Sequence, residues 1–554
     1  MAGEKQGKPD SRGLSFFDIT DFSAGIYDNS LISAGTAPNL VPGLFPAPPG
    51  AADVSDTYGC MSLPNGGLGP LPALGGAPGS GGLSLNNMGI STAGRAADIT
   101  ALANSFQTFG DELVIGITLP PSGGFQTTTF YSYQVGVGAS SLQTIQSATY
   151  NFGTNLKNFC AYPFTSLMTG GERPAQPVLC LPLTAPDGPT SALLVYPSIA
   201  APSAYGTDTI APVAGTAFGH QGRLVALQSL SYSWPTGISI YPNEAFNYTD
   251  PPQTETWPHQ YEIFGPEAPF GYGGINSVSA GELFCIKRRN GAIIIQGDLN
   301  NPTVTQLPGV QSTGNFYGRT DTDQNGMYYC SLNHGAWLWG GGNSSQKISN
   351  QLDNNFFATF NPITDTVAYG YYCQRWGDWM LFSNNWIYDS LKGSWWRLDN
   401  PATAASYFWY VSGFSPNYMF AAPQSVPADY DSFLYEYDLT IPRASFMWQS
   451  LPIKLPSEDR VSTIRELVIR ASNPYGDAVP VVSALLIDDK GDLTYLDPWS
   501  MTTGIGTIQE TRLQAGTKQT TTVAIQLFVH GTTYAPVIHS LGIGYRTREH
   551  VAIT

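Results

Sequence analysis

The acidic run Asp321-x-Asp323-x-Asn325-Gly326 has the residue types and the spacing with which a calcium-binding loop begins. Three side-chain oxygens alternate there and are followed by the glycine that such a loop needs for its sharp turn. The rest of the loop does not fit, because Leu332 stands where a bidentate glutamate should close the site. The run therefore favours a turn between two strands over a metal site.

Other residues with catalytic or ligating potential are scattered. The cluster Asp488, Asp489 and Asp492 surrounds a Lys-Gly step and is predicted to be the exposed tip of a hairpin. His220 and His334 lie beside predicted strands, in keeping with structural roles. His539 falls at an inward position of an alternating segment, which is typical of a core histidine with a hydrogen-bond partner.

Recognised active-site motifs are missing from the sequence. It contains no Gly-x-Ser-x-Gly nucleophile motif and no His-Glu-x-x-His zinc motif. The glycines of Gly340–Lys347 lack the spaced Gly-Lys-Ser/Thr of a phosphate-binding loop and are expected to end a strand. The acidic and aromatic segment Trp257–Tyr272 has side chains that could stack on sugar rings, although a connecting loop or a subunit contact explains it equally well. We therefore assign no catalytic, cofactor-binding or metal-binding residue, and we expect no cofactor.

The six cysteines do not form a metal-binding pattern. Their spacing includes no Cys-x-x-Cys pair, and Cys285 and Cys330 lie inside apolar runs, where a free cysteine behaves as a small hydrophobic residue. Reduced thiols are favoured over disulfides.

The aromatic stretch Tyr369–Asp399 predicts one complete antiparallel unit. Strand-forming residues fill Tyr371–Gln374, Trp379–Phe382 and Trp386–Tyr388, and each run is bounded by a turn signal. The pair Trp395-Trp396 provides a fourth strand. Such a unit is typical of one blade of a β-propeller.

Six further clusters of strand-forming residues occur between residues 96 and 443, which gives seven in all. The seven clusters lie at Leu113–Leu119, Val178–Val195, Arg223–Ile240, Glu282–Ile295, Met327–Trp339, Tyr371–Trp396 and Tyr407–Tyr437. Their spacing of roughly 50 residues is close to the period of known propeller repeats. We therefore predict a mostly β protein with a propeller of about six to eight blades, the alternative being an irregular pair of β-sandwiches.

The domain organisation follows from changes in composition along the chain. Residues 1–95 are rich in Gly and Pro with scattered hydrophobic residues, and they predict an extended arm that docks on other surfaces. Residues 96–443 form the predicted propeller, and residues 444–554 alternate clearly enough to predict a β-sandwich. A short helix is predicted at Ser344–Phe357, where Ile348, Leu352 and Phe356 are spaced four apart.

Composition and charge limit the functions that fit. The 554 residues include 42% hydrophobic and 12% charged residues, which excludes general disorder. The formal net charge of −16 argues against a broad surface that binds nucleic-acid phosphates. No apolar run is long enough to span a membrane, and the polar start of the chain has no secretory signal, so we expect synthesis in the cytoplasm.

Several sequence segments, taken in order, resemble the propeller-bearing tail proteins of tailed bacteriophages, including the nozzle (tail tubular) proteins of short-tailed phages. The Gly/Pro-rich section Leu40–Leu85 departs from the nozzle pattern and leaves the type of tail open. The segments that carry the resemblance are DITDFSAGIYDNSLIS (Asp18–Ser33), GHQGRLVALQS (Gly219–Ser229), ELFCIKRRNGAIIIQGDL (Glu282–Leu299), DQNGMYYCSLNHGAWLWGG (Asp323–Gly341), KISNQLD (Lys347–Asp353), NWIYDSLKGSWWRLD (Asn385–Asp399), RELVIRAS (Arg465–Ser472) and VIHSLGIGYRTR (Val537–Arg548).

The resemblance implies a structural protein of the virion tail, a nozzle or a tail-tip hub, without a catalytic role. It would form a homo-oligomeric ring around the channel for genome ejection, contact neighbouring tail or connector proteins, and let DNA pass without specific binding. Two other functions remain open. One is a receptor-binding propeller that binds or cleaves host-surface glycans, for which Trp257 and Trp376 are candidate contacts. The other is a bacterial adhesion module, which would need an export route.

Overall fold

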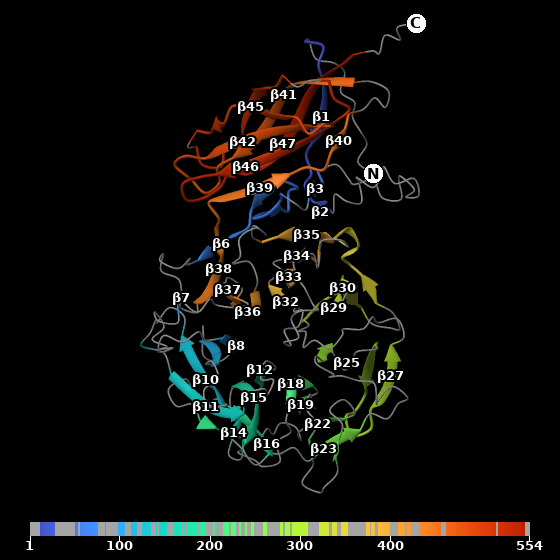
Figure 1. The fold of residues 1–554 in the computed structure, drawn as a ribbon, viewed down its shortest axis with the longest axis vertical. Coiled ribbons are helices and arrows are strands. Elements are labelled where there is room, and N and C mark those ends of the chain that lie inside the picture. The colour runs from blue at the N-terminus through green and yellow to red at the C-terminus, as the bar shows by residue number, and fades with distance from the viewer. Residues whose placement is uncertain are drawn as a thin grey trace.

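The secondary structure of the described residues is almost entirely β-strand, and the strands fill a larger body and a smaller one (Figure 1). The computed structural model describes the backbone of the strands named below. It describes side chains mainly for residues 12–27, 50–53, 56–72, 295–305, 323–328, 335–340, 345–352, 378–382, 386–398, 442–455, 461–502, 504–516 and 519–547, with a few isolated positions such as Arg375. Within this part of the chain there is no α-helix, and no helix is long and apolar enough to cross a membrane.

Seven antiparallel sheets follow one another in the larger body, as far as the described strands show. Each sequence cluster that predicted a set of strands falls in a different sheet. The seven sheets consist of β8 (Asp98–Ser105), β9 (Glu112–Thr118), β10 (Phe125–Gln134) and β11 (Gln143–Asn151); β12 (Cys160–Phe164), β15 (Gln176–Ala185), β16 (Gly188–Val195) and β17 (Ser203–Ala204); β18 (Ala214–His220), β19 (Arg223–Gln228), β22 (Ala245–Tyr248) and β23 (His259–Glu262); β24 (Ser277–Ala280), β25 (Leu283–Arg288), β26 (Gly291–Gln296) and β27 (Thr303–Leu307); β28 (Asp321–Asp323), β29 (Gly326–Ser331), β30 (Gly335–Trp339) and β31 (Gln346–Lys347); β32 (Cys373–Trp376), β33 (Trp379–Phe382), β34 (Trp386–Asp389) and β35 (Ser394–Arg397); and β36 (Phe408–Ser415), β37 (Tyr418–Pro423), β38 (Phe433–Pro442), β6 (Pro72–Gly75) and β7 (Leu83–Ser84).

The first strands of these sheets contact one another in a closed circle. Contacts run from β8 to β12, β18, β24, β28, β32 and β36, and β36 returns to β8. Two short ribbons are inserted in connections within a sheet: β13 (Leu167–Met168) with β14 (Gly171–Glu172) between β12 and β15, and β20 (Tyr232–Ser233) with β21 (Ser239–Ile240) between β19 and β22. The larger body is therefore a ring of sheets (Figure 1).

The sixth sheet of the ring is the unit predicted from Tyr369–Asp399. Its strands pair in the order β32-β33-β34-β35, with Trp379 opposite Trp376 and Trp386 opposite Phe382. All four residues of β34 and all four of β35 are buried, because neighbouring elements cover both faces of this sheet. The prediction of four strands is confirmed.

The helix predicted at Ser344–Phe357 is wrong for the residues that are described there. Gln346 and Lys347 form β31, which pairs with β30, and η4 (Asn350–Leu352) is a single 3-10 turn. The hydroxyl of Ser349 accepts a hydrogen bond from the backbone N–H of Ala336 at 3.0 Å. Ser349 therefore contacts the neighbouring strand β30 and does not form part of a helix.

The smaller body contains two six-stranded sheets. One comprises β1 (Ser15–Ile19), β4 (Cys60–Ser62), β5 (Leu68–Pro70), β41 (Val461–Ser472), β45 (Gln509–Gln514) and β47 (Val537–Arg548), and the other comprises β39 (Ser445–Gln449), β40 (Ile453–Lys454), β42 (Val481–Asp488), β43 (Leu493–Tyr495), β44 (Trp499–Ser500) and β46 (Thr522–His530).

Alternation along the strands sets the core that these two sheets share. Val523, Ile525, Leu527 and Val529 of β46 are all fully buried, as their spacing predicts. In β47 the alternation is interrupted, because Arg470 pairs with Ser540 whereas Ala471 pairs with Ile538. His539 is the extra residue of this bulge, so it is half-buried and does not occupy the inward position that was predicted.

The N-terminal arm joins the ring to the smaller body. β1 pairs along β47, β5 bridges to the same strand, and β6 lies at the outer edge of the seventh sheet of the ring. β2 (Ile26–Tyr27) and β3 (Ala52–Asp53) pair in parallel where the arm crosses between the bodies. The arm is therefore a structural part of both bodies.

A single cluster of buried side chains continues from the ring through the arm into the smaller body. Phe22 of the arm meets Trp448 of β39 edge to face at 5.2 Å, and Trp395 of β35 packs against Phe382 and Tyr388. Burying each such side chain contributes roughly 1.5–3 kcal/mol. The two bodies are thus held by a continuous core.

Candidate functional site

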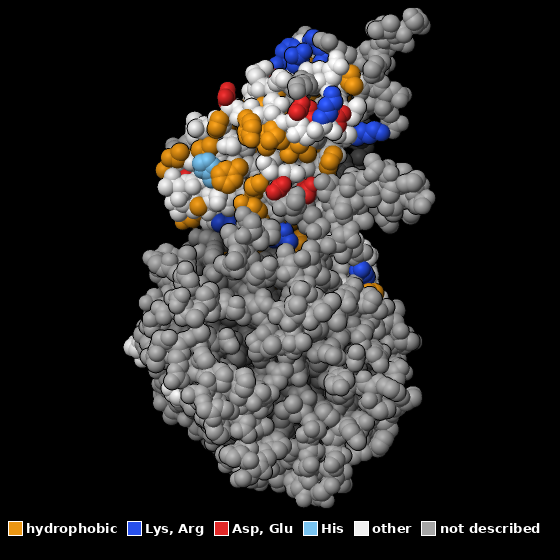
Figure 2. All heavy atoms as spheres, in the orientation of Figure 1, with side chains coloured by type: hydrophobic (Ala, Val, Ile, Leu, Met, Phe, Trp, Pro, Cys, Tyr) orange, Lys and Arg blue, Asp and Glu red, His pale blue; other side chains and the backbone are white. Residues whose placement is uncertain are grey.

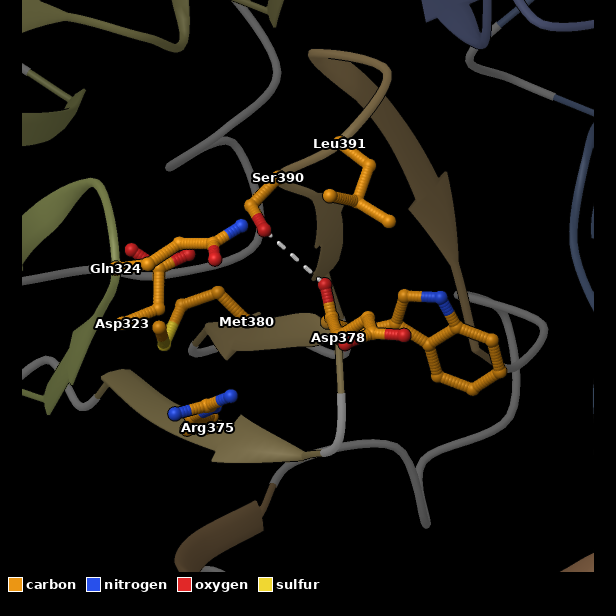
Figure 3. A pocket seen from close by; sticks show the side chains of 8 residues that line it. Asp323, Gln324, Arg375, Asp378, Met380, Ser390 and Leu391 are labelled. Atoms are coloured by element: carbon orange, nitrogen blue, oxygen red, sulfur yellow. Dashed lines mark hydrogen bonds between the residues drawn. The ribbon is translucent and has the colours of Figure 1, made fainter.

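A polar pocket lies between the fifth and sixth sheets of the ring (Figure 3). Asp323 reaches it from the end of β28 and Gln324 from the turn before β29, while Arg375 lies on β32 and Asp378 in the turn that follows. The hydroxyl of Ser390 donates a hydrogen bond of 3.2 Å to the backbone carbonyl of Asp378 and fixes one wall. The pocket therefore brings two carboxylates and one guanidinium to the same place.

The carboxylate of Asp323 is held by its own turn. Its Oδ1 accepts the backbone N–H of Asn325 at 2.7 Å, and its Oδ2 accepts the hydroxyl of Tyr328 at 3.1 Å. Burial, together with the nearby negative charge of Asp323, raises the pKa of Tyr328, although the hydrogen bond from Asn325 acts in the opposite direction. Tyr328 therefore stays protonated and acts as a hydrogen-bond donor. The prediction of a turn at 321–326 is confirmed.

The size of the pocket limits what it can hold. Its volume is about 50 Å³, which suits a few water molecules and not an enclosed sugar ring. Asp378 and Arg375 are exposed at its rim. The arrangement can offer hydrogen bonds to hydroxyl groups at the edge of a larger ligand.

A second constellation anchors the N-terminal arm against the ring. The ammonium group of Lys392 donates to the backbone carbonyls of Ser62 and Leu63 at 3.0 and 2.8 Å and to the Ser62 hydroxyl at 2.9 Å. The side-chain amide of Gln351 donates to the carbonyl of Ile26 at 3.0 Å. Cationic and amide groups of the ring thus satisfy backbone acceptors of the arm.

The other acidic cluster is a hairpin tip, as predicted. Oδ1 of Asp488 accepts the backbone N–H groups of Lys490 and Asp492, and Oδ2 of Asp489 accepts the hydroxyl of Thr521 at 2.7 Å. Burial opposes ionisation of Asp489, but the hydrogen bonds from Thr521 outweigh it and lower the pKa of Asp489. Within the described residues, no group of three or more His, Cys, Asp or Glu side chains is placed to hold a metal ion.

The histidines that the sequence singled out are only partly described. Nε2 of His539 lies 2.8 Å from the hydroxyl of Ser472, and burial lowers the pKa of His539, which favours the neutral ring. The backbone of His220 belongs to β18, whereas its side chain, the side chains of Trp257–Tyr272 and Trp376, and the whole of His334 lie outside the described residues.

The cysteine prediction can be followed at one position. Cys60 is a free, buried thiol, and burial raises its pKa, so the thiol stays protonated and inert. The side chains of the other five cysteines lie outside the described part of the chain. Gly340 directly follows β30, in agreement with the expectation that this glycine run ends a strand.

Sequence reasoning did not find the pocket between the fifth and sixth sheets. It predicted a turn at 321–326 and, separately, a turn between the runs Tyr371–Gln374 and Trp379–Phe382, and nothing in the sequence places these two turns side by side. The signal that could have found the site is the repeat itself, because equivalent turns of neighbouring units in a circular array lie close together.

Comparison with known proteins does not identify a family. No protein-family profile matches the chain, and no curated protein matches it. Among solved structures, a family 43 arabinoxylan arabinofuranohydrolase from Bacillus subtilis is similar over 82% of this chain and 96% of its own, with 9% identity and a TM-score of 0.23. A β-fructofuranosidase from Schwanniomyces occidentalis matches 89% of this chain and 98% of its own, with 8% identity and a TM-score of 0.24. AztD from Citrobacter koseri matches 61% and 86%, with 11% identity and a TM-score of 0.30.

Two of these structures are glycoside hydrolases. The prediction that the protein is not an enzyme is contradicted by the same comparison and is withdrawn. Because every TM-score is below 0.5, no activity or substrate is carried over to this chain.

Proposed function

We propose that this protein is a structural subunit of a bacteriophage tail, a nozzle or a tail-tip hub, located in the virion. In this proposal the ring of sheets is a seven-bladed β-propeller over residues 96–443, and the smaller body is a β-sandwich over residues 444–554. The subunits form a homo-oligomeric ring around the channel for DNA and contact neighbouring tail proteins.

The observation that carries the proposal is the course of the N-terminal arm. Its strands complete sheets in both bodies, and one buried core runs through all three parts. A component that must transmit load along a tail needs this kind of rigid connection between its domains. The order of arm, circular array and C-terminal sheets also agrees with the layout that the sequence resemblance implies.

The acidic composition is compatible with a conduit for DNA. A net charge of −16 disfavours binding to phosphates, and the repulsion acts over a screening distance of about 8–10 Å at physiological salt. DNA would therefore pass without being retained.

The test is imaging of the purified full-length protein together with virions of the phage that encodes it. We expect closed rings by negative-stain electron microscopy and the protein in the tail by immunogold labelling. A protein absent from purified virions would contradict the proposal.

A second candidate function, binding of host-surface glycans, is favoured by the polar pocket of Asp323, Arg375 and Asp378. Carboxylates and a guanidinium at a rim can hydrogen-bond to sugar hydroxyls without enclosing the ring. A glycan array probed with the wild-type protein and with Arg375→Ala and Asp378→Ala would test this function. Binding that both variants lose, and that Lys490→Met at the distant hairpin keeps, would support it, whereas no binding across the array would count against it.

A further inference from the structure

Three Asn-Gly pairs occur in the chain, at residues 65–66, 290–291 and 325–326. An asparagine before glycine is chemically labile, because glycine has no Cβ to hinder attack by its own backbone nitrogen on the side-chain amide. The structure describes the side chains of Asn65 and Asn325, and both are exposed at the tips of hairpins. The two pairs are alike in sequence, but their surroundings differ.

Asn65 lies at the tip of the hairpin between β4 and β5, in the N-terminal arm. Its Oδ1 accepts the backbone N–H of Gly67 at 3.1 Å. A donor at this oxygen stabilises the negative charge that develops there when a nucleophile attacks Cγ. Gly66, the residue between them, carries the attacking nitrogen. The turn therefore holds the nucleophile next to the carbonyl group that it must reach.

The backbone N–H of Gly66 is held by a shared acceptor. It donates to the carbonyl of Leu63 at 2.9 Å, and Nζ of Lys392 donates to the same oxygen at 2.8 Å. The ammonium group thus competes for this acceptor and places a positive charge near the nitrogen that has to lose its proton. Figure 2 shows several Lys and Arg side chains gathered toward the far end of the smaller body, whereas Lys392 belongs to the ring and contacts the hairpin directly.

Asn325 is held in the opposite way. Its Nδ2 donates to Oδ2 of Asp323 at 3.2 Å and to the hydroxyl oxygen of Tyr328 at 3.5 Å, so the amide is anchored through its nitrogen. Gly326 pairs with Asp323 in the strand ladder, and a Cβ at Gly326 would clash with the carbonyl of Trp339. Attack by the nitrogen of Gly326 therefore requires this hairpin to open.

We propose that Asn65 is a site of spontaneous deamidation in the folded protein. The nitrogen of Gly66 loses its proton to hydroxide, bonds to Cγ of Asn65 and closes a five-membered succinimide ring. The bond from Cγ to Nδ2 breaks, and the amide nitrogen takes a proton from water and leaves as ammonia. Water then opens the ring at one of its two carbonyls and gives isoaspartate or aspartate. The reaction depends on local geometry and is independent of the proposed function.

Deamidation at this site acts on contacts within the arm. The carbonyl of Gly66 accepts the N–H of Phe22 at 2.9 Å, and the carbonyl of Gly67 accepts the N–H of Leu63 at 2.7 Å. Isoaspartate inserts one more carbon into the backbone before Gly66 and displaces both acceptors. The new carboxylate also forms close to Asp21, whose Oδ1 would lie 3.4 Å from a Cβ at Gly66, and the like charges repel. The modified hairpin is therefore held less firmly.

The experiment incubates the full-length protein at mildly alkaline pH, folded and in urea, and maps a chymotrypsin digest by mass spectrometry. In urea we expect similar rates at Asn65 and Asn325, because both precede glycine. In the folded protein we expect Asn65 to react about tenfold faster than Asn325 or more, because reaction at Asn325 requires local opening. Equal rates at the two positions in the folded protein, or an Asn65 that stays intact there while it reacts in urea, would overturn the proposal.

A variant and a second readout complete the test. Asn65→Gln keeps the amide but would have to close a six-membered ring, so we expect no product at this position. Anion exchange separates the modified wild type, which carries one more negative charge. Hydrogen exchange at 59–71 should be faster in this fraction than in the unmodified one and should not change when Asn65→Gln is incubated. Equal exchange in the two fractions would contradict the loosening of the hairpin.

Discussion

Arg12 and Glu466, 454 positions apart in the sequence, form a bidentate ion pair. The two guanidinium nitrogens of Arg12 lie 2.9 and 2.8 Å from the two carboxylate oxygens of Glu466. Arg512 donates to the same carboxylate at 2.9 Å, and the Glu466 side chain is only 2% exposed. This pair holds Arg12, the first described residue of the N-terminal arm, on the smaller body.

Replacing Glu466 with Gln is expected to loosen the arm. Glutamine carries no negative charge and replaces one of the two acceptor oxygens with an NH2 group that faces a guanidinium donor, so we expect a loss of about 1–2 kcal/mol in the free energy of unfolding. Urea denaturation measures the loss, and hydrogen exchange should show faster exchange at 12–19. Arg12→Ala keeps the pair with Arg512 and should cost less. Equal protection of the arm in both variants and the wild type would contradict the assigned role.

Replacing Asp477 with Asn is expected to remove a pH-dependent contribution to stability. Burial opposes ionisation of Asp477, but four backbone N–H donors, from Val479 and residues 532–534, outweigh it and lower the pKa to about 2. Because the folded-state pKa lies below the unfolded value, the contribution is present above about pH 4 and is lost as the pH falls toward 2. We expect Asp477→Asn to cost about 2 kcal/mol at pH 7 and the difference from the wild type to shrink over that window. A difference that does not change between pH 7 and pH 2 would argue against this role.

Lys392 is expected to stabilise the arm against the ring. Lys392→Met keeps the aliphatic stem but leaves the carbonyls of Ser62 and Leu63 without this donor, at a cost of roughly 1–2 kcal/mol. The measurement is thermal unfolding combined with hydrogen exchange at 59–71. Lys490→Met at the exposed hairpin tip is the matched control and should change neither. A similar loss in both variants would point to a general effect of charge.

Gly25 is expected to tolerate no side chain, because the arm passes too close to β35. A Cβ at this position would lie 2.8 Å from the carbonyl oxygen of Trp395 and from Cβ of Ser394, and the backbone φ is +75°. Gly491 has a φ of +80°, and a Cβ added there would meet no atom within 4 Å. A substitution at Gly491 therefore measures the cost of the backbone conformation without a steric clash. We expect Gly491→Ala to cost about 1–2 kcal/mol and Gly25→Ala to cost more. Equal melting temperatures for the two variants would contradict a close approach at Gly25.

Local patterns in the sequence predicted the local structure well. The strands of Tyr369–Asp399 were found because each is bounded by a turn signal, and the buried residues of β46 were found because alternation has only one interpretation there. The helix at Ser344–Phe357 was wrong because a four-residue spacing was matched by residues that serve a strand and a single turn. His539 was misplaced because a bulge shifts the alternation by one residue.

Contacts between distant segments could not be predicted from one sequence. Nothing in the residues near Arg12 points to Glu466, and the turns that carry Asp323 and Asp378 give no sign that they meet. The exposed apolar side chains Tyr495 and Ile505 were not distinguished from core residues, because exposure depends on which face the fold covers.

The N-terminal strands also set the order in which the chain can fold. β6 pairs with β38, and β1 pairs with β47, whose last residues are near the end of the chain. During synthesis β1 and β6 are made well before β47 and β38, so they must wait for these partners, and the pairings are non-local, which slows folding. A chain interrupted before β38 has neither the last pairing of the seventh sheet nor a β47 with which β1 can pair, so both bodies are completed only after these late strands have been made.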